Sequence, residues 1–256
     1  YTHILVVLIN NESMYQYIHL YFKKNGRIMK RIIKKMINKV LGFYNYEMVN
    51  SKQLVDFYLH DYGSYEEYKD TQVFHNKRKI DNIWADSDTL GKIATEIQCN
   101  FSNDGILSGL CHGTRNGFEQ EYFNKNLNAE VIGTDISDTA SNFENTVEWD
   151  FHDKRDDWVD KFDFIYTNSL DQSWNPKLAL TTWLDQVHNN GIVFIEHTER
   201  HGPVGTSSMD PFGVKPRVMP YVLTKWFGNK ISIKIIKSKK PNLNIPVWVF
   251  AVKRNY

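Results

Sequence analysis

Residues 106–135 decide the fold, and they read ILSGLCHGTRNGFEQEYFNKNLNAEVIGTD. The apolar run at 106–110 follows an Asp-Gly turn pair, which predicts a short buried strand. Residues 111–117 predict a tight loop with room for a ligand to approach the backbone. A helix over 118–128 comes next, because its aromatic residues fall four apart on one face. Residues 129–134 then predict a second strand.

An acidic residue, Asp135, stands at the end of this second strand. In an open parallel sheet, ligands bind outside the carboxyl ends of the strands, where helix N-termini present free N–H groups. An Asp about 20 residues beyond a glycine loop is placed to accept hydrogen bonds from ribose hydroxyls. The stretch therefore predicts the site of a cofactor that contains adenosine.

The glycine spacing bears on which cofactor this is. The dinucleotide pattern G-x-G-x-x-G is absent, since Gly109, Gly113 and Gly117 are spaced by four. That spacing is weakly typical of short-chain dehydrogenases, whose Tyr-x-x-x-Lys pair should follow the cofactor loop. Tyr65 and Lys69 have this spacing but precede the loop. This order disfavours a nicotinamide enzyme.

Residues 147–151 predict a third strand that ends in an acidic residue beside an aromatic one. We expect Phe151 to stack on an adenine ring and the carboxylate of Asp150 to accept a hydrogen bond from the exocyclic amine. The two predicted acids then bind the two halves of an adenosine.

At this point residues 105–191 resemble the class I S-adenosylmethionine-dependent methyltransferases of the Rossmann-like superfamily. The run Cys-His-Gly-Thr-Arg at 111–115 stands where such enzymes usually carry Gly-x-Gly-x-Gly. Asp135 and Asp150 match the ribose and adenine acids of the family. Residues 162–170 match its fourth strand, and Asn190-Gly191 with the apolar run after it matches the glycine turn into the fifth.

The resemblance implies an α/β fold. Its Rossmann-like sheet is doubly wound, mostly parallel and seven-stranded, with a C-terminal antiparallel hairpin and an N-terminal helical segment. Residues 231–236 and 247–252 are the expected strands of that hairpin. It also implies S-adenosyl-L-methionine as the cofactor, and the matching binding positions are Cys111, His112, Gly113, Thr114, Asp135, Ile136, Asp150, Phe151 and Asn168.

One departure from the family concerns the amino-acid end of the cofactor. Family members usually carry an acid two residues before the first glycine, and that position is Gly109 here. The first and third glycines are replaced by Cys111 and Arg115. The amino-acid end must therefore be held differently, or cofactor binding is weak or lost.

The expected catalytic residues come from the ends of the fourth and fifth strands. An oxygen nucleophile usually needs a base, and histidine is the natural candidate near neutral pH. We expect His197 to be that base, with Asp171 and His201 lining the same pocket and residues 201–220 forming a Gly- and Pro-rich lid. The alternative is that His197 only hydrogen-bonds the lid backbone. The two cysteines, Cys99 and Cys111, do not have the spacing of metal ligands, and we expect no metal site.

The predicted activity is methyl transfer to a small or medium acceptor, most simply an oxygen of a sugar or related metabolite. This acceptor rests on analogy at the level of the fold. Two alternatives stay open. The basic C-terminus permits RNA as the acceptor, although no appended RNA-binding motif is present. The missing acid permits a catalytically inactive cofactor-binding or scaffold protein.

Charge is strongly segregated along the chain, although the net charge is only +1. Residues 1–50 carry +6, residues 51–210 carry −15 and residues 211–256 carry +10. The acidic middle suits a cationic sulfonium cofactor, and the basic ends suit an anionic acceptor or surface. Only two cysteines and no apolar run long enough to span a membrane favour a cytoplasmic protein.

Three segments are expected along the chain. Residues 1–28 fit poorly with the rest of the sequence and are predicted to be a non-native or disordered extension, with the natural protein starting at Met29. Residues 29–100 are predicted as the N-terminal helical segment, and residues 101–256 as the cofactor-binding methyltransferase domain.

Two helices are expected early in the helical segment. Residues 29–41 predict a basic amphipathic helix, which either covers part of its own domain or lies on an anionic membrane surface. The apolar residues of 54–59 also have a helical spacing.

Overall fold

The computed structural model describes residues 27–42, 52, 55–101 and 105–255. The chain divides into two units, Tyr1–Val55 and Asp56–Tyr256. In the first unit, helix α2 (Arg27–Gly42) confirms the predicted basic helix. Most of the expected extension at 1–28 lies outside the described residues. No helix in the described segments is long and apolar enough to cross a membrane.

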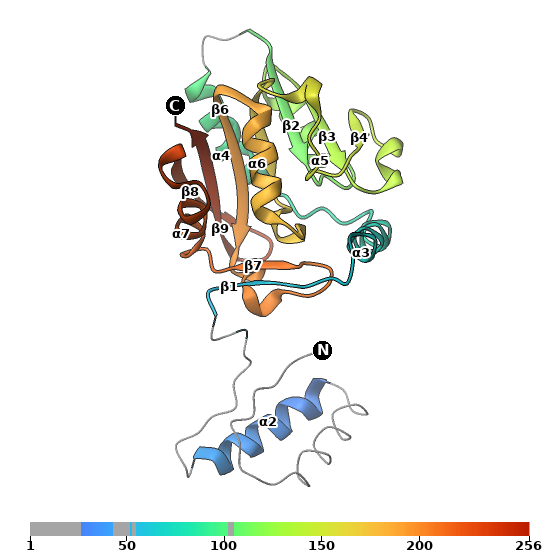
Figure 1. Cartoon of the computed structure of the whole chain (residues 1–256), viewed down its shortest axis with the longest axis vertical. Coiled ribbons are helices and arrows are strands. Elements are labelled where there is room, and N and C mark those ends of the chain that lie inside the picture. The colour runs from blue at the N-terminus through green and yellow to red at the C-terminus, as the bar shows by residue number, and fades with distance from the viewer. Residues whose placement is uncertain (1–26, 43–51, 53–54, 102–104, 256) are drawn as a thin grey trace. The chain divides into compact units, whose positions relative to one another are not determined.

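The second unit is built around a seven-stranded sheet in the order β4-β3-β2-β5-β6-β9-β8 (Figure 1). The pairs β4/β3, β3/β2, β2/β5 and β5/β6 are parallel, and the pairs β6/β9 and β9/β8 are antiparallel. This confirms the mostly parallel sheet with a C-terminal antiparallel hairpin. Its strands are β2 (Leu107–His112), β3 (Ala129–Asp135), β4 (Thr146–Glu148), β5 (Phe162–Thr167), β6 (Val187–Thr198), β8 (Ile231–Lys240) and β9 (Ile245–Arg254).

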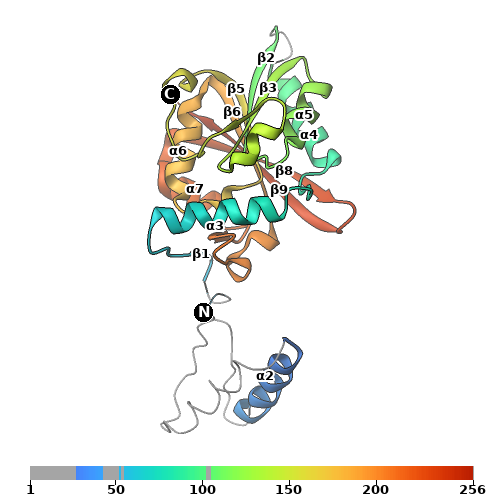
Figure 2. The same ribbon diagram turned by 90° about the vertical axis from the view of Figure 1, so that its right-hand side faces the viewer.

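Helices cover both faces of this sheet, as Figure 2 shows. On one face α6 (Pro176–Gln186) and α7 (Met219–Phe227) pack on a core that includes Trp183 and Phe250. On the other face α4 (Ser87–Asn100) and α5 (Phe118–Asn126) pack on a core that includes Phe123 and Phe164. The central strands are therefore buried on both sides, which explains their continuous apolar runs.

The N-terminal part of the second unit differs from the expectation. The apolar spacing of 54–59 predicts a helix, but β1 (Phe57–Leu59) is a strand that pairs antiparallel with β7 (Phe212–Val214). The prediction was wrong because six residues fit both periods, and pairing with a segment far along the chain decides between them. Helix α3 (Tyr65–Arg78) comes after β1, capped by the Ser64 side chain.

Three boundaries also shift. Strand β2 runs through Cys111 and His112, so the glycine loop starts later than expected. Strand β4 stops at Glu148, and Asp150 lies in a turn beyond it. Strand β6 begins at Val187, directly after α6, so it includes Asn190-Gly191, which were expected to form the turn before it.

The segment expected as a lid is largely ordered by pairing. Within 201–220 the structure places β7, and two short 3₁₀ turns surround Gly202. The backbone N–H of His60 donates to Pro211 O at 2.8 Å, and Gln72 Nε2 donates to Met209 O at 3.2 Å. This segment is thus tied to the residues before and within α3.

Candidate functional site

A cavity lies at the carboxyl ends of β2, β3 and β5. Helix α3 runs across this edge of the sheet (Figure 2). It consists of two adjoining pockets, here called the first and the second pocket. Both are lined by Lys79, Gly113, Arg115 and Gln172. A ligand that fills both pockets therefore passes over the loop after β2.

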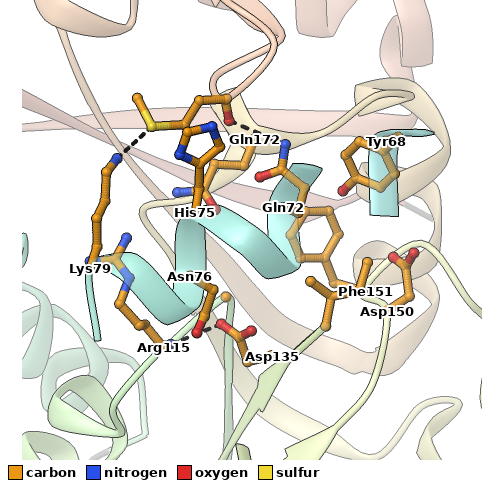
Figure 3. A pocket seen from close by; sticks show the side chains of 13 residues that line it. Tyr68, Gln72, His75, Asn76, Lys79, Arg115, Asp135, Asp150, Phe151 and Gln172 are labelled. Carbon is orange, nitrogen blue, oxygen red and sulfur yellow. Dashed lines mark hydrogen bonds between the residues drawn. The ribbon is translucent and has the colours of Figure 1, made fainter. Parts of the chain in front are cut away.

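One face of α3 forms a wall of the first pocket (Figure 3). Helical spacing brings its polar side chains to that face. The facing wall comes from the turns after β3 and β4. The α3 residues are Tyr68, Gln72, His75 and Asn76, and the residues opposite are Asp135, Ile136, Asp150 and Phe151.

The loop after β2 is held tightly against its neighbours. Gly113 has φ +70°, and a Cβ atom there would lie 2.6 Å from the Ser169 side chain. The backbone N–H groups of Gly113 and Thr114 both donate to Thr134 O, at 2.9 and 3.0 Å. Only glycine fits this position, and the loop lets a ligand approach its backbone.

Asp135 is buried at the end of β3, and its carboxylate accepts hydrogen bonds from two backbone N–H groups. Its Oδ2 accepts from the N–H of Arg115 at 3.1 Å, and its Oδ1 accepts from the N–H of Ser137 at 2.9 Å. Burial raises the pKa of the carboxyl, and the two backbone N–H groups oppose that rise. Asp135 therefore joins the glycine loop to β3, and it lines the first pocket, where the Asn76 side chain also interacts with its carboxylate.

Asp150 lies in a hydrogen-bond network that the sequence did not predict. Its Oδ1 accepts from the N–H of His152 at 2.9 Å and contacts His152 Nδ1 at 2.6 Å, while its Oδ2 accepts from the Tyr65 hydroxyl at 2.6 Å. His152 Nε2 lies 2.7 Å from Ser173 Oγ. Burial raises the pKa of Asp150, but these hydrogen bonds outweigh it and hold the pKa below its usual value.

The second pocket has a volume of about 300 Å³ and is lined by charged side chains of both signs. Three carboxyl groups line it, of which Glu119 and Asp171 are buried and Asp210 is half-buried. Burial raises the pKa of each to about 7. The cationic side chains of the lining are Lys79, Arg115 and Arg200.

Asp171 and His201 form a pair in this pocket. His201 Nε2 lies 3.8 Å from Asp171 Oδ2, and both side chains are about nine-tenths buried. Asp171 Oδ1 is buried and has no hydrogen-bond partner among the described residues. Burial, Lys240 and Arg200 lower the pKa of His201 to about 4, so it is neutral near pH 7.

Comparison with solved structures decides what this arrangement resembles. The chain is similar to Burkholderia thailandensis 1,6-didemethyltoxoflavin-N1-methyltransferase, solved with 1,6-didemethyltoxoflavin and S-adenosylhomocysteine. The TM-score is 0.59 at 11% identity, over 77% of this chain and 92% of that one. The chain has the class I methyltransferase fold.

Two more solved structures share this methyltransferase fold. The plantazolicin methyltransferase BpumL in complex with S-adenosylhomocysteine has a TM-score of 0.54 at 16% identity, over 74% of this chain and 96% of that one. A methyltransferase in complex with the Haloferax volcanii activator Trm112 has a TM-score of 0.54 at 11% identity, over 75% and 98%. No protein-family model and no curated protein sequence matches the chain.

Within the methyltransferase fold, two of the expected cofactor residues turn their side chains away from the cavity. Cys111 is fully buried in the α4/α5 core. His112 is buried too, with Nδ1 2.9 Å from Thr134 Oγ1 and Nε2 2.8 Å from Gln186 Oε1. Both belong to β2 rather than to the loop, and neither lines a pocket.

The other expected cofactor residues do line the cavity. They are Gly113, Thr114, Asp135, Ile136, Asp150, Phe151 and Asn168.

His197 lies elsewhere than expected. Its ring is 1% exposed, and Nε2 lies 2.8 Å from the backbone carbonyl of Val214 in β7. It lines neither pocket. Burial lowers its pKa to about 3, so a protonated form is strongly disfavoured. This favours the alternative, a histidine that holds the segment expected as a lid, while Asp171 and His201 do line one pocket.

Several residues of the cavity were not predicted from the sequence. The α3 wall is polar and shows no apolar period, so it gave no signal. Glu119 stands in the first turn of α5, four residues beyond Arg115, and could have been found by asking which acids come after the loop. Trp84 and Asp210 come from connecting segments and carry no motif.

The dehydrogenase alternative finds no support in the cavity. Tyr65 uses its hydroxyl to hold Asp150. A second Tyr-x-x-x-Lys spacing, Tyr221 to Lys225, lies on α7 with Tyr221 exposed, and neither residue lines a pocket. In the part of the chain that the structure describes, no three His, Cys, Asp or Glu side chains are grouped to hold a metal ion.

Proposed function

We propose that the chain binds S-adenosylmethionine across both pockets and transfers its methyl group to a small or medium acceptor. The observation that carries the proposal is the continuity of the pockets over the Gly113 loop, with Asp135 at one end and Asp171 at the other. In this arrangement Asp135 binds the ribose, Ile136 and Phe151 flank the adenine, and the methionine end enters the second pocket.

The residues present fit this cofactor. A cationic ligand suits the second pocket, because buried carboxylate oxygens of Glu119 and Asp171 have no hydrogen-bond partner among the described residues. The carboxylate of Asp150 has little acceptor capacity left for the cofactor. Its carboxylate offers about four acceptor positions, and three are used by Tyr65 and His152. One position is left for the adenine amine.

In methyl transfer the protein mainly positions the acceptor and the cofactor relative to each other. When bound, S-adenosylmethionine supplies an electrophilic methyl group. Asp171 is the proposed proton acceptor, because its pKa of about 7 matches a general base at neutral pH and Oδ1 is unoccupied. The acceptor hydroxyl would pass its proton to Oδ1 as its oxygen bonds to the methyl carbon, while the bond from that carbon to sulfur would break with its electron pair going to sulfur, so that S-adenosylhomocysteine would be the leaving group. His201 would orient the carboxylate, as a positioning residue.

The proposed acceptor is an oxygen of a sugar or a related metabolite, with a negative group. Lys79, Arg115 and Arg200 support the negative group, since their charges line the second pocket. Its volume of about 300 Å³ suits a metabolite rather than a folded macromolecule.

Calorimetric titration with S-adenosylhomocysteine tests the cofactor. No measurable binding would refute the proposed function. A labelled methyl donor, offered with a panel of sugar phosphates and hydroxy acids, then tests turnover. Asp171→Asn should lower turnover by about 10²–10⁴-fold and leave the affinity for S-adenosylhomocysteine within about threefold.

The same experiments separate the alternatives. Methylation of RNA, with binding that falls steeply as salt rises, would favour an RNA acceptor over a metabolite. Binding of S-adenosylhomocysteine without turnover on either class would favour the inactive scaffold.

A further inference from the structure

Glu119 is a buried acid at the N-terminal end of α5 with half of its carboxylate unused. It is 6% exposed, and its Oε1 accepts from Asn168 Nδ2 at 3.1 Å. Its Oε2 is shielded from solvent and has no hydrogen-bond partner among the described residues. An unpaired buried carboxylate oxygen is costly, so a native structure that keeps one gives reason to look for a ligand that pairs with it.

The second pocket shows where such a ligand would lie. Glu119 lines it together with Gly113, Thr114 and Asn168, which come from the ends of β2 and β5. Burial raises the pKa of Glu119 to about 7, and nearby Glu196 adds to the rise while Arg115 opposes it. The Arg115 guanidinium is directed to the carbonyl of Asn82 at 2.8 Å, so it does not pair with Glu119. The pocket thus offers a carboxylate to a cation that the described residues do not supply.

The neighbouring strand explains why this acid comes from the helix. A Cβ atom at Gly109 would lie 2.5 Å from Phe164 Cζ, far closer than carbon atoms pack. The Phe164 ring is fully buried and packs edge-to-face on Phe123, with ring centroids 5.4 Å apart. The ring fills the space that a side chain at 109 would need. No carboxylate can be supplied from that strand position, and Glu119 is the buried acid that faces the pocket from the adjoining helix.

We infer that Glu119 binds the α-ammonium group of the methionine end of the cofactor. This rests on the proposed function and adds the residue that replaces the acid missing at Gly109. An ammonium group has three N–H donors and a positive charge, so it satisfies Oε2 and neutralises the buried carboxylate. The N-terminal end of α5 favours the ionised form of Glu119 as well.

The test compares two ligands that share the adenosine and differ in the amino-acid end. S-adenosylhomocysteine carries the α-ammonium group, and 5′-methylthioadenosine lacks the whole amino-acid end. Glu119→Gln keeps an oxygen that accepts from Asn168 but removes the charge. By calorimetric titration it should weaken S-adenosylhomocysteine by about 10–100-fold and change 5′-methylthioadenosine by less than about threefold. Glu121→Gln, an exposed change on the same helix, should alter neither ligand.

Two outcomes overturn the inference alone. Unchanged affinity of Glu119→Gln for S-adenosylhomocysteine would exclude the contact, and an equal loss for both ligands would show that Glu119 only shapes the loop. If the wild type binds neither ligand, the proposed function itself fails.

A second measurement needs no variant and so does not depend on Glu119→Gln folding. The wild type should bind an S-adenosylhomocysteine analogue with hydrogen in place of the α-amino group about 10–100-fold more weakly. Equal affinity for the two would overturn the inference.

Discussion

Lys240 lines neither pocket but lies behind the cavity wall, and its replacement should destabilise the fold. It is 3% exposed at the end of β8, and its Nζ lies 2.7 Å from Glu196 Oε1 and 3.1 Å from Asp86 Oδ2. It also donates to the carbonyl of Trp84 at 2.6 Å. The Tyr166 hydroxyl donates to the other oxygen of Glu196 at 2.7 Å. One cation therefore balances two carboxyl groups in the interior.

Lys240→Met keeps the aliphatic volume and removes the charge. Breaking a buried ion pair on one side costs about 3–5 kcal/mol, because the remaining charge is left uncompensated. For a domain of this size each kcal/mol shifts Tm by about 2–4 °C, so we expect a fall of roughly 6–20 °C. Thermal and urea unfolding followed by circular dichroism would measure it.

The loss should depend on pH in a definite direction. Burial raises the pKa of Glu196, and Lys240 opposes that rise. Without the lysine the pKa of folded Glu196 moves further above its unfolded value, so protonation then favours the folded state. The deficit should be largest near pH 8 and shrink towards pH 5. Adding Glu196→Gln should recover most of it at pH 8.

Lys239→Met is the matched control, because that neighbouring side chain is exposed and its replacement should change stability by less than about 0.5 kcal/mol. The reasoning would be refuted if Lys240→Met behaved like this control, or if its deficit were the same at both pH values.

Three further predictions concern the cavity and the central strand. Asp171→Asn should raise Tm more at pH 8 than at pH 4.5, because burial lifts the pKa of the folded carboxyl to about 7 and the aspartate therefore costs the folded state stability progressively as pH rises from about 4 to about 7; an equal effect at both pH values would contradict this. Asp135→Ala should weaken S-adenosylhomocysteine more than about tenfold in a calorimetric titration through the lost ribose hydrogen bonds, whereas the exposed change Asp138→Ala should not. Gly109→Ala should destabilise the fold by about 1–3 kcal/mol in urea unfolding, because its Cβ would meet Phe164 at 2.5 Å; an unchanged midpoint would show that the ring moves aside freely.

The central strands of the sheet were predictable from the sequence because each carries its own local signal. Residues 107–112 and 129–135 are short apolar runs bounded by turns, and an acid marks the end of the second. Such signals need no knowledge of distant contacts, and the mostly parallel sheet with its antiparallel hairpin was predicted from the family resemblance.

Side-chain direction was the part that the sequence did not determine. His197 ends a strand close to the expected site, but successive side chains of a strand point to opposite faces. Its pairing with Trp248 in β9, and the Val214 carbonyl beside it, fix which face it takes. Position along the chain predicted the right strand end and the wrong direction.

The cover of the cavity was unpredictable for a different reason. The face of α3 that contains Gln72 and Asn76 is polar, so it resembles a solvated helix in the sequence. Its role depends on contacts with a segment more than a hundred residues away, such as the bond from Gln72 to Met209. Only the folded chain brings these two segments together.

That pairing has a consequence for how ligands come and go. The wall above the first pocket and the β7 segment beyond the second are joined through β1, so lifting α3 must either break the β1–β7 ladder or carry 207–214 with it. The two pockets therefore share one covering segment, because Met209 lines the first pocket and Asp210 lines the second. We therefore expect that the two ligands do not exchange independently. The ligand that binds first limits both the volume and the access route that remain for the second.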